Sequence, residues 1–214
     1  MSETATSVQE ALPVRIIGCG AIAREILAVC EANGLTHIDL VCLPAKWHLY
    51  PEKIAPGVQA AIREAREEGF SNIYVAYADC GTGGMLDRVC EEEDVGRIAG
   101  PHCYSFFAGN EKFETWDDDI DAFFLTDFLA RQFEAFIVEP LALDRHPELR
   151  DMYFGNYRKL VYLSQKADQE LQEKARQAAE YLGLEYEYRF TGYGDLRGAL
   201  MAAVPAATKP DPVI

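Results

Sequence analysis

The fold is decided by the stretch Val14-Arg15-Ile16-Ile17-Gly18-Cys19-Gly20-Ala21-Ile22-Ala23, in which a short apolar run meets a glycine-rich turn. The run Val14–Gly18 is typical of a buried strand. Apolar residues then recur at helical spacing over Ala21–Ala32, and Asn33-Gly34 supplies a helix stop. A strand, a tight turn and a helix in direct succession predict the first half of a βαβ unit.

The same alternation continues along the chain and predicts an α/β fold. Strands are expected over Ile38–Leu43, Asn72–Ala78, Arg97–Gly100, Lys159–Ser164 and Glu185–Phe190, and helices over 51–69, 85–92, 168–182 and 195–203. We therefore predict one doubly wound, Rossmann-like domain over residues 13–205, with a mostly parallel sheet of about six strands. Residues 106–157, including helical spacing over Phe123–Phe136, form a mostly helical insertion or cap, and residues 1–12 and 206–214 form flexible tails.

Composition excludes several classes of function. The chain carries 35 acidic and 20 basic residues, a formal charge of −15, so its surface repels phosphate backbones and we expect no nucleic-acid partner. No apolar run approaches the length of a membrane span, and the acidic start Met1-Ser2-Glu3 is unlike a signal peptide. We expect a cytoplasmic protein whose six cysteines are thiols or metal ligands.

The turn Gly18-Cys19-Gly20-Ala21-Ile22-Ala23 fits the dinucleotide pattern G-x-G-x-x-G/A between a strand and a helix. Its glycines Gly18 and Gly20 would let a pyrophosphate approach the backbone. The carboxylate that should hold a ribose is missing, because the second strand ends in Leu43-Pro44-Ala45. NAD(P) binding, phosphate binding and a purely structural turn therefore all stay open, and NAD(P) is not the leading interpretation.

Three cysteines follow directly on predicted parallel strands. Because parallel strands end at one edge of a sheet, Cys19, Cys80 and Cys103 are expected to lie together there. His48 and His102 come from neighbouring segments of the same edge. Sulfur and imidazole ligands suit zinc, and three sulfurs suit an iron–sulfur cluster. The alternative is that these cysteines are small buried hydrophobic residues, as we expect for Cys30, Cys42 and Cys90.

The segment Asp79-Cys80-Gly81-Thr82-Gly83-Gly84 allows a second interpretation of the same edge. Gly81, Thr82 and Gly83 could form a nest of amides that binds an anion or cofactor. A catalytic Cys80 with His48 as base is conceivable. The structural alternative is a strand-to-helix turn in which Thr82 caps the helix. Further along, the run Trp116-Asp117-Asp118-Asp119 is expected to be an exposed acidic loop.

Several of these segments together resemble a known protein family. They are Cys19, Leu43-Pro44 followed by His48, Tyr77-Ala78-Asp79-Cys80-Gly81, His102-Cys103-Tyr104 with Gly109, and Phe124-Leu125-Thr126-Asp127. The chain from Val14 to Leu200 resembles an uncharacterised bacterial and archaeal family known as a domain of unknown function. Members are often encoded beside corrinoid-dependent methyltransferases, so the resemblance implies a role in one-carbon metabolism. The family's Gly-Tyr-Gly-like stretch is replaced here by Ala76-Tyr77-Ala78.

The leading functional hypothesis is a metal- or cluster-binding protein in corrinoid-linked methyl transfer. A corrinoid protein or methyltransferase is the expected partner, together with a small-molecule ligand. The first alternative is a binding module for folate, a nucleotide or a corrinoid that performs no chemistry, and the second is an NAD(P)-dependent oxidoreductase. Whether the protein is an enzyme, and whether it forms a homo-oligomer, the sequence leaves open.

Overall fold

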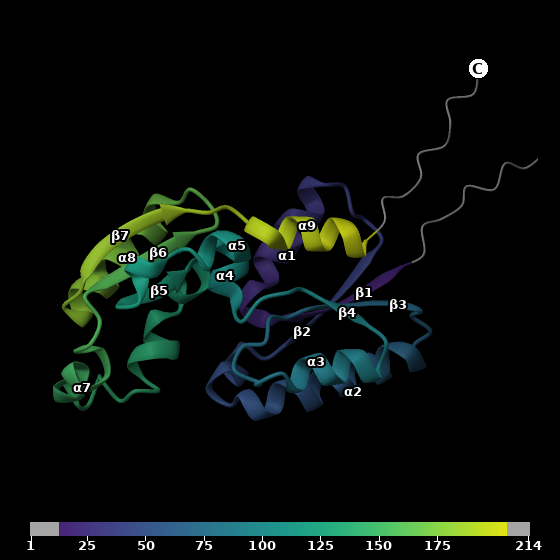
Figure 1. Cartoon of the computed structure of the whole chain (residues 1–214), viewed down its shortest axis with the longest axis horizontal. Helices are drawn as coiled ribbons and strands as arrows, with labels where there is room; N and C mark the ends of the chain where they lie inside the picture. Colours follow the sequence, from purple (N-terminus) through teal and green to yellow (C-terminus); the bar gives the residue numbers. More distant parts are fainter. Residues whose placement is uncertain (1–12, 205–214) are drawn as a thin grey trace, which may run out of the picture.

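The structure is a computed structural model that describes residues 13–204, in which two parallel β-sheets lie side by side along the long axis (Figure 1). The predicted tails at 1–12 and 206–214 lie outside the described residues. Each sheet has its own cluster of buried apolar side chains.

The first sheet has the strand order β2-β1-β3-β4 and is parallel throughout. Its strands are β1 (Val14–Cys19), β2 (Ile38–Leu43), β3 (Asn72–Ala76) and β4 (Gly96–Arg97). Helices α1 (Ala23–Ala32) and α9 (Gly194–Ala203) cover one face, and α2 (Ile54–Glu67) and α3 (Met85–Glu92) cover the other (Figure 1). All six residues of β1 are buried because this central strand is covered on both faces.

The second sheet has the order β5-β6-β7 and is also parallel, with strands β5 (Ala122–Thr126), β6 (Lys159–Ser164) and β7 (Glu185–Phe190). Helix α8 (Gln169–Leu182) packs on one face. Asp168 caps α8 by accepting hydrogen bonds from the amides of Glu170 and Leu171, and Gly183 ends it in the left-handed conformation, as predicted. On the other face lies α4 (Cys103–Ala108), followed by α5 (Asn110–Phe113).

Short helices fill the connections and carry several candidate site residues. The 3-10 helices are η1 (Gly20–Ile22), η2 (Ala45–Leu49), η3 (Pro51–Lys53), η4 (Asp117–Asp119) and η6 (Pro147–Leu149). The α-helices α6 (Asp127–Arg131) and α7 (Arg150–Phe154) and the π-helix η5 (Glu134–Val138) complete the segment between β5 and β6.

The predicted α/β class with parallel strands is confirmed, but the prediction of one sheet with about six strands is wrong. The difference starts at Ala122–Thr126, which we expected to be part of a helical insertion over 106–157 and which forms β5. A short run of buried apolar residues fits a strand and a helix equally well, and its aromatic residues favour the strand. Because β5 pairs with β6 and β6 with β7, the C-terminal strands form a sheet of their own. The division of the chain into domains stays a prediction.

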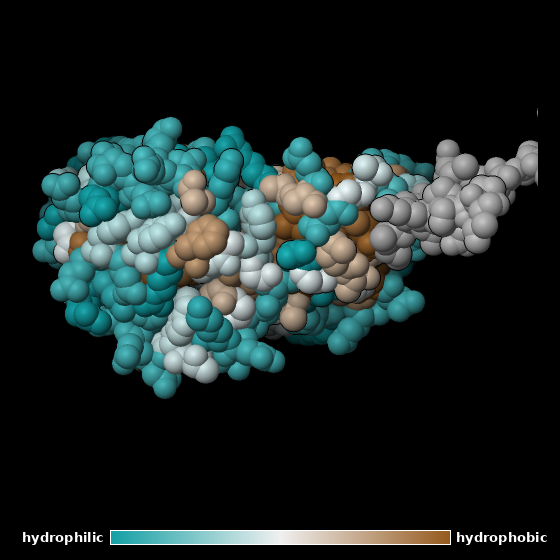
Figure 2. Space-filling model, turned by 90° about the horizontal axis from the view of Figure 1, so that it is seen from above, coloured by the Kyte–Doolittle hydropathy of each residue, from teal (hydrophilic) through white to brown (hydrophobic). Residues whose placement is uncertain are grey.

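The outer surface is uneven in character. Seen from the side of α1 and α9, hydrophobic residues gather over these two helices, whereas the end that holds the second sheet is mostly hydrophilic (Figure 2). Leu27 of α1 and Met201 of α9 are among the exposed apolar residues. Among residues 13–204, no helix combines the length and the apolar character needed to cross a membrane.

Candidate functional site

The candidate site begins with Cys19, the last residue of β1, which is buried at the C-terminal edge of the first sheet. Its sulfur accepts a hydrogen bond from the amide of Ala21 at 3.3 Å and so caps η1. The next segment of this edge is η2, and Trp47 anchors it on Gly57 of α2. A Cβ atom at Gly57 would lie 2.2 Å from the Trp47 ring, so only glycine permits this contact.

His48 follows Trp47 and lies beside Cys19. Its Nδ1 is 2.9 Å from the carbonyl oxygen of Ala45, and its two ring nitrogens are 3.8 and 4.0 Å from the Cys19 sulfur. The ring stacks on Tyr77, with centroids 6.1 Å apart. Burial acts to lower the pKa of His48, but hydrogen bonds and charge from the sulfurs of Cys19 and Cys80 raise this pKa to about 11. The two sulfurs therefore favour a proton on the imidazole, and a metal ion at Nε2 would displace that proton.

Cys80 is brought to the same edge by the loop after β3. The amide of Asp79 donates to Gly100 at 3.1 Å and the amide of Cys80 donates to Pro101 at 2.8 Å, which ties this loop to the segment before Cys103. Cys80 has a φ of 48°, in the left-handed region that a cysteine rarely adopts. Strained backbone of this kind is concentrated at functional sites.

The predicted anion nest around Gly81, Thr82 and Gly83 is filled by the protein's own Asp79. The Asp79 carboxylate accepts hydrogen bonds from the Thr82 hydroxyl at 2.5 Å and from the amides of Gly83 and Gly84 at 3.2 and 2.9 Å. Burial acts to raise the pKa of Asp79, but these hydrogen bonds lower it. The Thr82 hydroxyl also accepts from the amide of Leu86 in the first turn of α3. The N-cap of α3 is Gly84, however, so the predicted N-cap position of Thr82 is wrong by two residues.

Cys103 is the first residue of α4 and is half-buried. Burial, followed by the charges of Cys80 and Cys19, raises the pKa of the Cys103 thiol well above its usual value. The Tyr77 side chain, 1% exposed, is buried between these groups. Burial and the nearby sulfurs of Cys19, Cys80 and Cys103 raise the pKa of Tyr77, and its hydroxyl has no well-placed hydrogen-bond partner among the described residues.

The remaining predicted site residues have other neighbours. The His102 ring accepts a hydrogen bond from the amide of Ser105 at 3.4 Å, which caps α4, and packs against Tyr104 and Phe113. Burial lowers the pKa of His102. Gly18 lies within β1, and a Cβ atom at Gly20 would lie 3.0 Å from the carbonyl oxygen of Leu43. Packing against the next loop is therefore sufficient to explain Gly20.

The other cysteines divide between core and surface. Cys30 and Cys90 are buried, as predicted. The expectation that Cys42 is a core residue is wrong, because β2 is the edge strand of the first sheet and leaves Cys42 exposed.

An apolar cavity of about 160 Å³ adjoins this cluster. The first sheet's C-terminal edge contributes Ala21, His48 and Cys103 to its wall, and the second sheet's side contributes Thr126 and residues that follow it. The apolar residues from that side include Phe123, Phe128, Leu129, Phe136 and Ile137. The cavity therefore has a soft, polarizable wall of sulfur and imidazole and an aromatic wall opposite.

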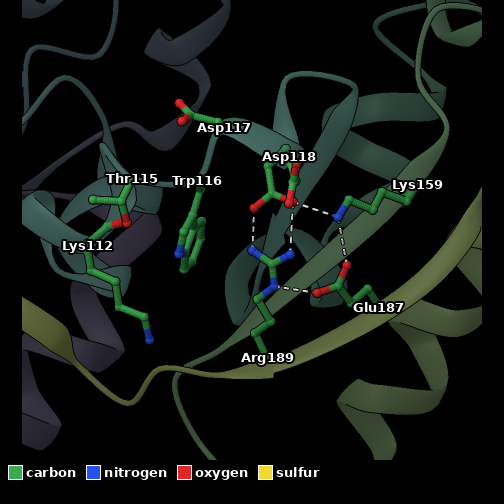
Figure 3. Close-up of a pocket in the computed structure, with 9 residues that line it drawn as sticks. Lys112, Thr115, Trp116, Asp117, Asp118, Lys159, Glu187 and Arg189 are labelled. Carbon is green, nitrogen blue, oxygen red and sulfur yellow. Dashed lines mark hydrogen bonds and ion pairs between the residues drawn. The ribbon is translucent and has the colours of Figure 1, made fainter.

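A separate, open pocket lies between residues 112–119 and strands β6 and β7 and is strongly charged (Figure 3). Arg189 and Lys159 both bind the carboxylate of Asp119 and both also bind Glu187. Asp117 and Asp118 are exposed as predicted for the acidic run, but Asp119 is 8% exposed and fully paired, so that prediction is wrong for Asp119. The paired charges indicate a structural network.

Within residues 13–204, no group of three or more His, Cys, Asp or Glu side chains is already placed to hold a metal ion. The predicted sharing of one metal by Cys19, Cys80, Cys103 and His48 thus stays a prediction. What the arrangement offers chemically is a set of buried and half-buried thiols, an imidazole and a buried phenol beside a small cavity. Sequence reasoning overlooked Tyr77, although it lies two residues before the Asp79–Gly84 loop.

Comparison with known proteins gives one result. No curated protein and no solved structure matches the chain. The model of one family matches residues 42–200, a range that includes His48, Tyr77, Cys80 and Cys103, strands β3 and β4, and the whole second sheet, whereas β1 with Cys19 lies before it. The chain therefore belongs to the family described as "Protein of unknown function (DUF1638)".

Proposed function

We propose that the protein binds a soft metal ion or an iron–sulfur cluster through Cys19, Cys80, Cys103 and His48. The observation that carries this proposal is the gathering of these groups around the buried hydroxyl of Tyr77, which has no well-placed hydrogen-bond partner among the described residues. A buried polar group without a partner is costly to keep unless a ligand satisfies it.

The donor set fits such a ligand. Three sulfurs and one imidazole are the ligands of structural and catalytic zinc sites, and three sulfurs also suit a cluster. The contact between Nδ1 of His48 and the carbonyl of Ala45 is the outer hydrogen bond that orients many metal-binding histidines and leaves Nε2 free. Because no three groups are already in ligand positions, binding requires local movement of the loops that carry them.

The proposed biological role is corrinoid-linked one-carbon metabolism, and this part rests on the family resemblance alone. When bound, zinc would activate a thiolate for methylation, and a cluster would supply an electron to reduce cobalt. The protein's own residues would exclude water through the aromatic wall, and His48 would serve as a neutral ligand. A corrinoid protein or a methyltransferase is the partner that this role requires.

The test is metal content and an absorption spectrum of protein purified without oxygen. We expect bound metal in the wild type and a clear loss in each of Cys19→Ser, Cys80→Ser and Cys103→Ser. The matched controls are Cys42→Ser, on the exposed edge strand β2, and Cys90→Ser, on the buried face of α3. Both controls should keep the metal. Unchanged metal content in all three site variants would contradict the proposal.

A second candidate is a metal-free thiol site that binds a small molecule, and the cavity favours it. Its volume of about 160 Å³ is below the roughly 300–1,000 Å³ of sites for drug-sized ligands, so a few-atom ligand fits better than folate, a nucleotide or a corrinoid. In this case alkylation by iodoacetamide should label the half-buried Cys80 or Cys103 in preference to the buried Cys19, and His48→Gln should slow it. Equal labelling rates in both proteins would argue against a Cys–His pair.

A further inference from the structure

A second enclosed region lies at the C-terminal edge of the second sheet. This cavity has a volume of about 300 Å³, and Asp127, Lys166 and Tyr193 in its wall follow β5, β6 and β7 respectively. Helix α1 of the first sheet closes it with Arg24 and Glu25. In parallel sheets this edge is the usual position for a ligand. The cavity contains none of the cysteines or histidines of the proposed metal site.

Glu25 is the unusual group in this wall. It is 5% exposed, and one carboxylate oxygen, Oε1, accepts a hydrogen bond from Arg131 at 3.2 Å. The other oxygen, Oε2, is buried and has no hydrogen-bond partner among the described residues. A buried carboxylate oxygen without a donor is unfavourable, so the site lacks one donor that a ligand could supply.

The second buried carboxylate of this wall, Asp127, needs no further partner. Its oxygens accept hydrogen bonds from the Tyr162 hydroxyl at 2.7 Å and from the amides of Gln165 and Lys166, both at 3.1 Å. Asp127 therefore fixes the loop after β6. The only carboxylate oxygen in this wall that is both buried and unpartnered, within the described part of the chain, belongs to Glu25.

Besides Arg131, two cations line the cavity, and its remaining carboxylate, Asp168, accepts hydrogen bonds from the amides of Glu170 and Leu171. Arg24 and Lys166 line its exposed side, and their side chains form no ion pair with any carboxylate in residues 13–204. A ligand that donates N–H groups to Glu25 in the interior can therefore place an anionic group between these two cations at the mouth.

We propose that this cavity is a second ligand site and that it binds a small zwitterion with an ammonium group and a carboxylate, such as a free amino acid. The ammonium group would donate to Oε2 of Glu25, and the carboxylate would pair with Arg24 and Lys166. This proposal does not depend on metal binding at the cysteines.

The experiment is thermal unfolding of the whole chain with each of the standard L-amino acids. For any amino acid that raises the midpoint, the matched amine without the carboxylate and the matched acid without the ammonium group are measured as well. We expect at least one amino acid to bind and both single-charge analogues to bind more weakly. No shift with any amino acid, or equal shifts with an analogue, would overturn the proposal.

Two variants assign the charges. Glu25→Gln should weaken binding of the amino acid by about tenfold or more, because it removes a charge-assisted hydrogen bond. Glu31→Gln, which removes the same charge from an exposed position of α1, should leave binding unchanged. Equal affinity in Glu25→Gln and wild type would refute the role of Glu25.

Arg24→Gln provides a test that does not disturb the core, because Arg24 is exposed. It should weaken binding of the amino acid while leaving binding of the matched amine unchanged, and no change for the amino acid would refute the role of Arg24. Metal content should stay at the wild-type level in both Glu25→Gln and Arg24→Gln, which separates this site from the proposed metal site.

Discussion

The hydroxyl of Tyr77 gives the sharpest test of the candidate site, because its removal should stabilise the free protein. Tyr77→Phe keeps the ring that stacks on His48 and deletes only an oxygen that is buried without a well-placed partner. An unsatisfied buried polar group costs about 1–3 kcal/mol in proteins. The sulfur of Cys19, a weak acceptor close to the hydroxyl, recovers part of this cost. We therefore expect the free energy of unfolding to rise by about 1 kcal/mol.

Tyr162→Phe is the matched control, since Tyr162 is equally buried but its hydroxyl donates to Asp127 at 2.7 Å. Loss of a hydrogen bond to a charged group should lower the free energy of unfolding by about 1.5–3 kcal/mol. The same atom removed from two buried tyrosines thus has opposite effects. For a chain of this length, 1 kcal/mol corresponds to about 2–4 °C in the unfolding midpoint.

The assay is urea unfolding followed by circular dichroism, with metal-free protein under reducing conditions. If Tyr77→Phe destabilises the protein as much as Tyr162→Phe does, the Tyr77 hydroxyl is satisfied within the protein. In that case the Tyr77 hydroxyl gives no evidence for a ligand among the cysteines. Addition of zinc should then stabilise wild type and variant equally, whereas a ligand that engages the hydroxyl stabilises the wild type more.

Two further perturbations test the surroundings of the sites. Asp119→Asn should lower the free energy of unfolding by about 3 kcal/mol, because it leaves Arg189 and Lys159 with Glu187 alone, whereas the neighbouring exposed Asp118→Asn should change it by less than about 0.5 kcal/mol. Hydrogen bonds from Arg189 lower the pKa of Asp119. The stabilising effect of Asp119 should therefore be fully present above its ordinary pKa of 3.8 and be lost as the pH falls through its lower folded-state pKa. Urea unfolding at a series of acidic pH values measures this loss. Cys80→Gly should be neutral or stabilising by up to about 1 kcal/mol in the metal-free protein, since glycine adopts a φ of 48° without strain, while Cys80→Val should be destabilising by about 1–2 kcal/mol. A destabilised Cys80→Gly in the same unfolding assay would show that the left-handed backbone is not strained.

The local parts of the fold could be predicted from the sequence where periodicity and end signals agree. Lys159–Ser164 and Met85–Glu92 have the predicted bounds, because each is a single apolar pattern between clear breaks. The run Ala122–Thr126 could not be assigned by periodicity. Its first four residues are all apolar, so they show neither a helical nor a strand period, and helix α6 follows without a loop. That single strand decides whether the chain forms one sheet or two, so a local ambiguity became an error in the global topology.

Only those parts of the candidate site that follow from strand topology could be predicted from the sequence. Cys19 and His48 lie together because β1 and β2 are parallel neighbours, whose ends must share an edge. The neighbours of His102 depend on the conformation of one turn, in which its ring caps α4, and no sequence pattern specifies that choice. Glu25 was overlooked for a different reason. As a charged residue in an amphipathic helix it is expected to be solvated, and only the tertiary structure buries it and pairs it with Arg131 of α6.

The Tyr77–Gly81 segment and the Phe124–Asp127 segment lie far apart in the chain, but both help to position the walls of the small cavity. The amide of Cys80 in the Tyr77–Gly81 segment donates to the carbonyl of Pro101 and so holds the segment that leads to Cys103, the one cysteine in the wall of the small cavity. The segment Phe124-Leu125-Thr126-Asp127 positions the opposite wall. Thr126 caps α6 by accepting a hydrogen bond from Leu129, and Asp127 is held by Gln165 and Tyr162, so Phe128 and Leu129 have little freedom to move away from the cavity. A rigid apolar wall facing thiols excludes water from whatever binds there. The ligand must accordingly be small, and the second motif should act by excluding water and selecting ligand size while the cysteines provide the chemistry.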